Sequence, residues 1–235
     1  MVNKQLKAGI IYDGPSLIDG QPIVAIATYS DKNTKTGQVL QTYILCKDID
    51  PRLASKKGLD VSICGDCIMR GKPTADPKRK IAKERECYVR IDQGPLLVWK
   101  SYRRGVYPIA TNQSDRILLG LNRVVRVGTY GDPAAIPSFI WDQLLTESET
   151  WMAYTHQKPW RPDIAMQSAD SYLEAASHWA NGRRTFRAVA NLGEVDKQNE
   201  TVCPASKEMG RRVQCADCRL CKGSAKAKSI AIVQH

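Results

Sequence analysis

Two β-branched apolar runs stand near the start of the chain. PIVAIATYS covers residues 22–30, QVLQTYILC covers residues 38–46, and the polar sequence DKNTKTG lies between them. Two such runs joined by a polar turn are typical of an antiparallel hairpin. Residues 47–86 are rich in charge and proline and predict loops.

From Cys87 onward, short apolar runs alternate with amphipathic segments. The apolar runs predict strands over residues 87–92, 124–130, 151–156, 164–170, 184–190 and 229–235. The segments between them predict helices over residues 95–105, 114–122, 138–147 and 171–182, with Ser114 or Asp115 as one cap and Ser168 or Asp170 as another. This alternation indicates βαβ units and a mostly parallel sheet.

We therefore expect an α/β fold with an N-terminal β-hairpin and cysteine-rich metal-binding loops. About six β/α strands are too few to close an eight-stranded barrel, so a partial β/α barrel or an open sheet fits better. The predicted parts are a hairpin and cysteine-containing loop region (1–86), a β/α core (87–202), and a four-cysteine segment with the final strand (203–235).

Composition narrows the class of protein. A chain of 235 residues can bury a full core without disulfides. No apolar run reaches the ~18 residues of a membrane-spanning helix, and the N-terminus lacks the apolar segment of a secretory signal. We therefore expect no membrane partner and a reducing cytoplasm, where clustered cysteines bind metal more often than they form disulfides.

The net charge of +11 favours polyanionic partners, and nucleic acid is the commonest of these. The predicted helix 95–105 interleaves aromatic and basic residues, including Trp99, Arg103 and Arg104, a pattern that suits stacking on bases beside phosphates. The alternative is that its aromatic residues pack inward and its charges face solvent. No P-loop, dinucleotide-binding glycine motif or deaminase signature is present.

Half of the eight cysteines lie close together near the C-terminus, as Cys203, Cys215, Cys218 and Cys221. Paired C-x-x-C spacing suits a tetrahedral thiolate site, which predicts structural zinc. The same spacing with Cys203-Pro204 also occurs in [4Fe–4S] sites, and uncoordinated thiols or disulfides are the third alternative.

A second set of four cysteines is spread more widely along the chain. Cys64 and Cys67 form a compact CGDC turn, Cys87 follows, and Cys46 is the natural fourth member. This set predicts a second zinc site. The alternative is that Cys46 and Cys87 are ordinary core residues.

Polar residues gather where the predicted strands end, which is where α/β folds place their chemistry. We expect Asp132 and His156 to act as a catalytic pair or as ligands of an ion, with Tyr130, Gln157, Asp170, Arg103 and Arg104 contacting substrate. The rival interpretation assigns these residues to turns and helix caps, and a terminal histidine, His235, to a loose chain end.

The ordered motifs CGDCIMRG, CYVRIDQGPLLVWKSYRRGVYP, VRVGTYGDPAAIP, YTHQ and CPASKE…CADCRLC…AKSIAIVQH resemble a family of uncharacterised cysteine-rich proteins of tailed bacteriophages. The resemblance covers most of residues 60–235. It implies a phage origin, hence the host cytoplasm, and no particular activity.

A GDP segment at a strand end also looks like radical S-adenosylmethionine (radical-SAM) barrels, although their C-x-x-x-C-x-x-C motif is absent. Transglycosylases that exchange bases in nucleic acid are similar in being β/α barrels with a late zinc site, and Asp132 would be the nucleophile.

Three functions follow from these patterns. The first is a zinc-stabilised phage protein that binds nucleic acid in replication or host takeover. The second is a β/α enzyme acting on a nucleotide or a nucleic-acid base through Asp132 and His156. The third is an iron–sulfur protein of the radical-SAM type.

Overall fold

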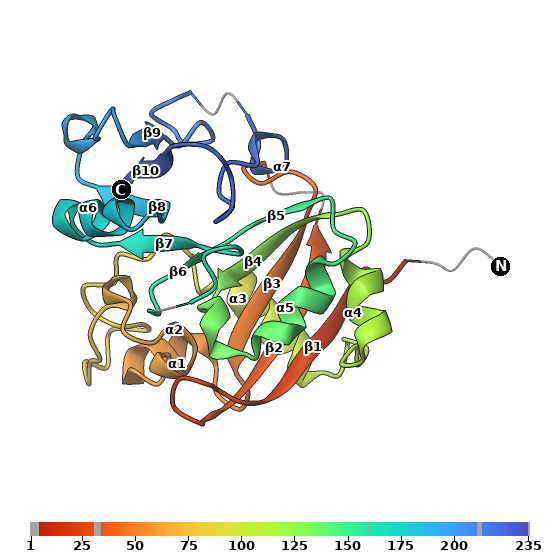
Figure 1. Ribbon diagram of the computed structural model, residues 1–235. Helices are drawn as coiled ribbons and strands as arrows, with labels where there is room; N and C mark the ends of the chain where they lie inside the picture. Colours follow the sequence, from red (N-terminus) through yellow and green to blue (C-terminus); the bar gives the residue numbers. More distant parts are fainter. Residues whose placement is uncertain (1–4, 31–33, 159, 211–212, 235) are drawn as a thin grey trace.

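The computed structural model describes residues 5–30, 34–158, 160–210 and 213–234, so His235 lies outside the described residues. Its strands form two five-stranded sheets (Figure 1). The first sheet has the order β1 (Ala8–Pro15), β2 (Pro22–Ser30), β3 (Val39–Cys46), β4 (Val124–Tyr130) and β5 (Thr150–Met152). The second has the order β6 (Tyr154–Thr155), β7 (Met166–Ala169), β8 (Thr185–Val189), β10 (Ser229–Val233) and β9 (Glu200–Val202).

The N-terminal hairpin is confirmed. β2 and β3 pair antiparallel from Ile23 opposite Cys46 to Ser30 opposite Val39. β1, which the sequence analysis did not predict, adds to β2 as a third antiparallel strand. From β3 onward, every neighbouring pair is parallel in both sheets. The fold is therefore α/β and mostly parallel, as expected.

One extended segment connects the two sheets. β5 pairs with β4, β6 pairs with β7, and only Ala153 separates β5 from β6. The Ala153 carbonyl accepts a hydrogen bond from the Met166 amide at 3.0 Å, so the pairing with the second sheet begins there. The single strand predicted over 151–156 is thus divided between two sheets.

Four predicted helices are present and end slightly earlier than expected: α3 (Gly94–Arg103), α4 (Gln113–Gly120), α5 (Ser138–Leu145) and α6 (Tyr172–Ala180). Their predicted caps were wrong by a few residues, because Asn112 caps α4 and Ser171 caps α6. The structure adds the short helices α1 (Pro51–Lys57), α2 (Val61–Cys64) and α7 (Cys215–Cys218), and the 3₁₀ turns η1 (Ile68–Arg70), η2 (Pro133–Ala135) and η3 (Leu192–Glu194).

The strand predicted over residues 87–92 was wrong, because these residues form turns. The Cys87 amide bonds to the Met69 carbonyl at 2.9 Å, so this segment is held by a neighbouring loop and not by a sheet.

The main core lies on the first sheet. β3 is buried at every position, which requires packing on both of its faces. On α5, Ile140, Trp141 and Leu144 are fully buried and share the face that packs on this core. No described helix is long and apolar enough to span a membrane.

The turn after β4 depends on Gly131, whose φ is +85°. A Cβ there would lie 2.7 Å from the Cβ of Ile44 and 3.0 Å from the Ile44 carbonyl oxygen. Because neither neighbour is a flexible side-chain end, we expect Gly131→Ala to lower the free energy of unfolding by about 2–4 kcal/mol. Urea denaturation measures this, and Gly20→Ala (φ +78°, no contact within 4 Å) is the control for the backbone term alone. A loss no larger than that of the control would contradict the packing argument.

Candidate active site

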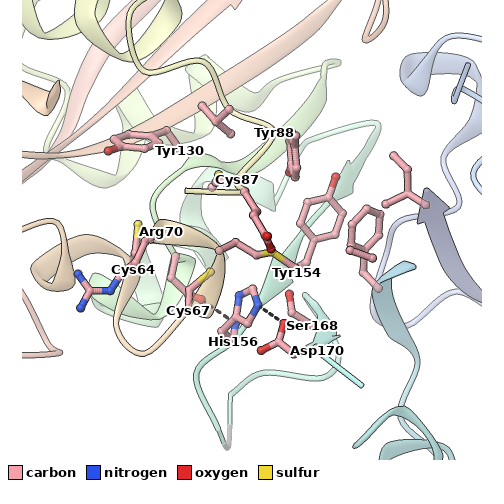
Figure 2. Close-up of a pocket in the computed structure, with 18 of the residues that line it drawn as sticks. Cys64, Cys67, Arg70, Cys87, Tyr88, Tyr130, Tyr154, His156, Ser168 and Asp170 are labelled. Carbon is pink, nitrogen blue, oxygen red and sulfur yellow. Dashed lines mark hydrogen bonds and ion pairs between the residues drawn. The ribbon is translucent and has the colours of Figure 1, made fainter. Parts of the chain in front are cut away.

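A cavity of about 240 Å³ opens at the carboxyl ends of the parallel strands (Figure 2). β4, β6, β7, β8 and β10 contribute to it, and residues from the 60–89 loop form its remaining wall. Of the predicted site residues, it brings together Tyr130, Asp132, His156 and Asp170 with three of the cysteines. This edge is where the sequence placed the chemistry.

Cys64, Cys67 and Cys87 all line the cavity from the same loop region (Figure 2). Burial is the main cause that raises the pKa of the Cys64 thiol, and the neighbouring Asp60, Cys67 and Cys87 raise it further. The three thiols therefore share one electrostatic neighbourhood.

Cys46, the expected fourth member, lies outside the cavity lining that these three thiols share. It is buried at the end of β3, its thiol lies 3.5 Å from the Leu59 carbonyl oxygen, and burial raises its pKa to about 12.

The CGDC turn is fixed by Gln157, which follows β6. Gly65 has φ +59°, and Gln157 covers it so closely that a Cβ would lie 2.1 Å from the Gln157 amide nitrogen. That amide donates to Asp66 at 2.8 Å and to the Cys64 carbonyl at 3.3 Å. Gln157, predicted to contact substrate, therefore holds the cysteine loop in place.

His156 lies between Asp170 and Cys67. Its Nε2 is 3.2 Å from the Asp170 carboxylate (Figure 2). Burial alone would lower the pKa of His156, but hydrogen bonds to Asp170 and Cys67 outweigh it and raise the pKa to about 10. The imidazole is thus held in one orientation beside the thiols.

The Asp132 carboxylate is buried and accepts three hydrogen bonds. They come from the Ala134 amide at 2.9 Å, the Thr155 hydroxyl at 2.7 Å and the His156 amide at 2.8 Å. Burial, the largest effect, raises its pKa, although these bonds oppose the rise. Asp132 therefore caps η2 and ties the end of β6 to the end of β4.

Three buried polar atoms of the cavity wall have no hydrogen-bond partner among the described residues: the Tyr130 hydroxyl, the Thr129 hydroxyl and Arg85 Nε. Tyr130 is 3% exposed and Thr129 is 8% exposed. Leaving such groups without a partner costs about 1–3 kcal/mol each.

Aromatic rings form the end of the cavity nearest the second sheet. Tyr154 and Phe186 stack with centroids 4.3 Å apart. The Tyr88 hydroxyl accepts a hydrogen bond from Arg126 at 2.9 Å, and the guanidinium carbon lies 5.7 Å from the ring centre. The cavity therefore has a thiol end and an aromatic end.

The C-terminal cysteines gather at a separate place. Cys203 follows β9, Cys215 and Cys218 are the two ends of α7, and Cys221 comes three residues later. Burial raises the pKa of Cys221, and the other three thiols raise it further, so all four lie near one another. None of them lines the cavity.

As the side chains stand, no group of three or more Cys, His, Asp or Glu within the described ranges is arranged to hold a metal ion. Arg103 and Arg104 lie at the end of α3, outside the cavity wall, where Arg103 pairs with Asp48 at 2.9 Å.

Arg85, Tyr88 and Thr129 line the cavity but were not predicted from the sequence. Tyr88 directly follows Cys87, Arg85 lies two residues before it, and Thr129 directly precedes Tyr130, so their neighbours along the chain were the available signal. Comparisons of the chain with protein-family models, with curated proteins and with solved structures found no match.

Proposed function

We propose that this chain is an iron–sulfur enzyme of the radical-SAM type, with its cluster on Cys64, Cys67 and Cys87. The observation that carries the proposal is that three thiols from one loop region face a cavity at the carboxyl ends of parallel strands. Three thiolates with an open side are the arrangement of a reactive centre, whereas closed four-thiolate sites are structural.

The space beside the thiols favours a cluster over a single ion. One zinc ion would need all three sulfurs about 2.3 Å from a common point and would leave most of the adjoining cavity empty. A cube of four irons and four sulfurs binds each thiolate on a different iron, so it suits thiols set further apart and fills part of the adjoining 240 Å³.

The cavity continues from the thiols to its aromatic end, which supports a second occupant. The likeness of the GDP segment (131–133) to radical-SAM barrels implies that this occupant is S-adenosylmethionine, and the cavity of about 240 Å³ would have to widen to admit it beside a cluster. When bound, the cluster would supply the single electron that cleaves it. The barrel geometry itself remains a prediction.

The chain's own residues would prepare this centre. Gln157 holds the CGDC turn that carries two of the three thiols. His156, oriented by Asp170, stands beside Cys67 and would hold a proton within the cavity. The transglycosylase alternative has less support, because the oxygens of Asp132 are engaged in three hydrogen bonds.

For the C-terminal cysteines we propose structural zinc. The four thiols lie near one another outside the cavity lining, and Cys203, Cys215 and Cys221 pack on apolar residues of both sheets, including Met166, Ile230 and Val124. A bound zinc ion would replace the mutual repulsion of the four thiolates by attraction.

The test is metal analysis of serine variants after anaerobic purification. Wild-type protein should be brown, with absorbance at about 400 nm and both iron and zinc bound. Cys64→Ser, Cys67→Ser and Cys87→Ser should each lose iron and colour while keeping zinc. Cys218→Ser should lose zinc while keeping iron and colour.

Cys46→Ser is the matched control, because this buried thiol lies outside both groups; it should keep both metals. A colourless wild-type protein that takes up no iron after reconstitution with iron and sulfide would refute the cluster. Loss of iron in the Cys46 variant, with its fold intact, would contradict the three-thiol assignment.

A further inference from the structure

Residues 72–83, here called the basic hairpin, project from the loop that forms the cavity wall. Lys72 and Lys83 pair antiparallel, with N–O distances of 2.9 and 3.0 Å in the two directions. The hairpin contains five basic residues and one acidic residue. Its single carboxylate, Asp76, accepts a hydrogen bond from the Lys78 amide at 2.9 Å and so serves the turn.

Four cations of the hairpin have no carboxylate partner. Lys78, Arg79, Lys80 and Lys83 are exposed, and no ion pair between described residues includes any of them. Unpaired cations concentrated on one short element repel one another and create a local positive field. Such a field attracts a polyanion and releases its counterions.

The hairpin is attached directly to the cavity. Arg70 before it and Arg85 after it both line the cavity, as do Cys87 and Tyr88. Gly71 has φ +79°, and a Cβ there would lie 2.5 Å from the Lys83 carbonyl oxygen, so the two stems meet closely at the wall. A chain of phosphates on the hairpin would therefore reach the mouth of the cavity.

We propose that single-stranded nucleic acid docks along the basic hairpin and places one base in the aromatic end of the cavity. The stacked pair Tyr154–Phe186 and the ring of Tyr88 offer flat surfaces for a base. A paired base cannot enter a cavity of this size without leaving its duplex, so single strands are favoured over double strands.

This assignment names the substrate class of the proposed enzyme, but the docking step rests on the hairpin and not on the cluster. A rival explanation is that the net charge of +11 attracts any polyanion to the whole surface. The two explanations differ in whether the position of a charge matters.

The experiment compares two variants with the same change in charge. The hairpin variant carries Lys78→Gln, Arg79→Gln, Lys80→Gln and Lys83→Gln. The control carries Lys100→Gln, Lys197→Gln, Lys207→Gln and Lys226→Gln, which are exposed residues outside the hairpin. Anisotropy of a labelled single-stranded oligonucleotide is measured at several salt concentrations.

The hairpin variant should bind at least tenfold more weakly than wild type. Its slope of log K against log salt should fall by about 3, because four phosphate contacts contribute about 0.7 each. The control should stay close to wild type. Equal losses in the two variants would overturn the proposal in favour of diffuse charge, and so would wild-type affinity in the hairpin variant.

Two further measurements separate this proposal from others. Oligonucleotide binding is measured before and after reconstitution with iron and sulfide; an affinity that does not follow the iron content lets the docking step stand if the cluster assignment fails. Inorganic polyphosphate should compete poorly, because it offers no base to the aromatic end. Equal competition by polyphosphate, or tighter binding of a matched duplex, would refute the assignment of a single-stranded nucleic acid.

Discussion

Glu200→Ala should lower the free energy of unfolding by about 3–5 kcal/mol, because it would leave a buried guanidinium without its counter-ion. Glu200 is on β9 and its side chain is fully buried; the Arg187 side chain on β8 is 4% exposed. The two form a bidentate pair at 2.9 and 2.6 Å. The pair links β8 to the edge strand β9 across β10, which lies between them in the second sheet.

The carboxylate of Glu200 has a second role. It accepts the Asp196 amide at 2.9 Å, while Arg187 donates to the Glu194 carbonyl at 2.8 Å. The pair therefore fixes the connection from β8 to β9 as well as the strands. β9 contributes only Glu200–Val202 to the sheet, so it has little else to hold it in place.

Urea denaturation of Glu200→Ala, Glu200→Gln and the double variant Arg187→Met/Glu200→Leu would measure this effect. Glu200→Gln keeps an acceptor for Arg187, so its free energy of unfolding should fall less than that of Glu200→Ala. The apolar double variant removes both charges and should lie within about 1–2 kcal/mol of wild type. A Glu200→Ala protein as stable as wild type would show that the charge is not buried in solution.

Strong local patterns predicted most of the fold. β2, β4 and β10 are β-branched runs, and their predicted positions were confirmed to within two residues. α5 has a full apolar face, and its start at Ser138 was predicted correctly. In these segments local propensity and burial agree, so the sequence alone is informative.

The errors came where distant contacts decide the structure. CYVRID alternates like a strand, yet it pairs with no described strand, and the Cys87 amide bonds to the loop at Met69. β9 is too short to leave a pattern, and the Arg187–Glu200 pair, which spans 13 residues, helps to place it. Neither contact can be recognised from neighbours along the chain.

The candidate site shows the same difference between features that local spacing indicates and features that depend on distant contacts. Cys203, Cys215 and Cys218 each raise the pKa of Cys221, so the four thiols whose spacing suggests a common site lie near one another. Cys46, expected as the fourth member of the other set because it ends a strand, is buried at the end of β3 and does not line the cavity. The contact of Gln157 with Cys64 joins residues 93 positions apart and left no local signal.

Asp132→Ala should destabilise the protein by about 4 kcal/mol, which is the second large effect that we expect. Alanine would leave three buried donors without an acceptor, namely the amides of Ala134 and His156 and the hydroxyl of Thr155. Each unsatisfied donor costs about 1–3 kcal/mol, and partial relaxation reduces the sum.

Asp132→Asn separates a structural role from the nucleophile predicted by the sequence. If the role of the Asp132 carboxylate is structural, Asp132→Asn should lower the free energy of unfolding by about 2 kcal/mol. The asparagine NH₂ group would then face one of the three donors that the carboxylate accepts from. A nucleophile predicts loss of activity with stability unchanged. Asp142→Asn is the matched control, since Asp142 is half exposed and pairs with Arg161 at the surface; it should change stability by less than about 1 kcal/mol.

Urea denaturation reports the stability of each variant, and amide hydrogen exchange at His156 reports whether the end of β6 has come loose. Faster exchange at His156 in Asp132→Asn, together with reduced stability, would establish that Asp132 positions the histidine beside Cys67 and Asp170. If Asp132→Asn instead unfolds like wild type and protects the His156 amide equally, the carboxylate is dispensable to the fold. Its burial at the strand end would then be explained by chemistry, as the sequence analysis first predicted.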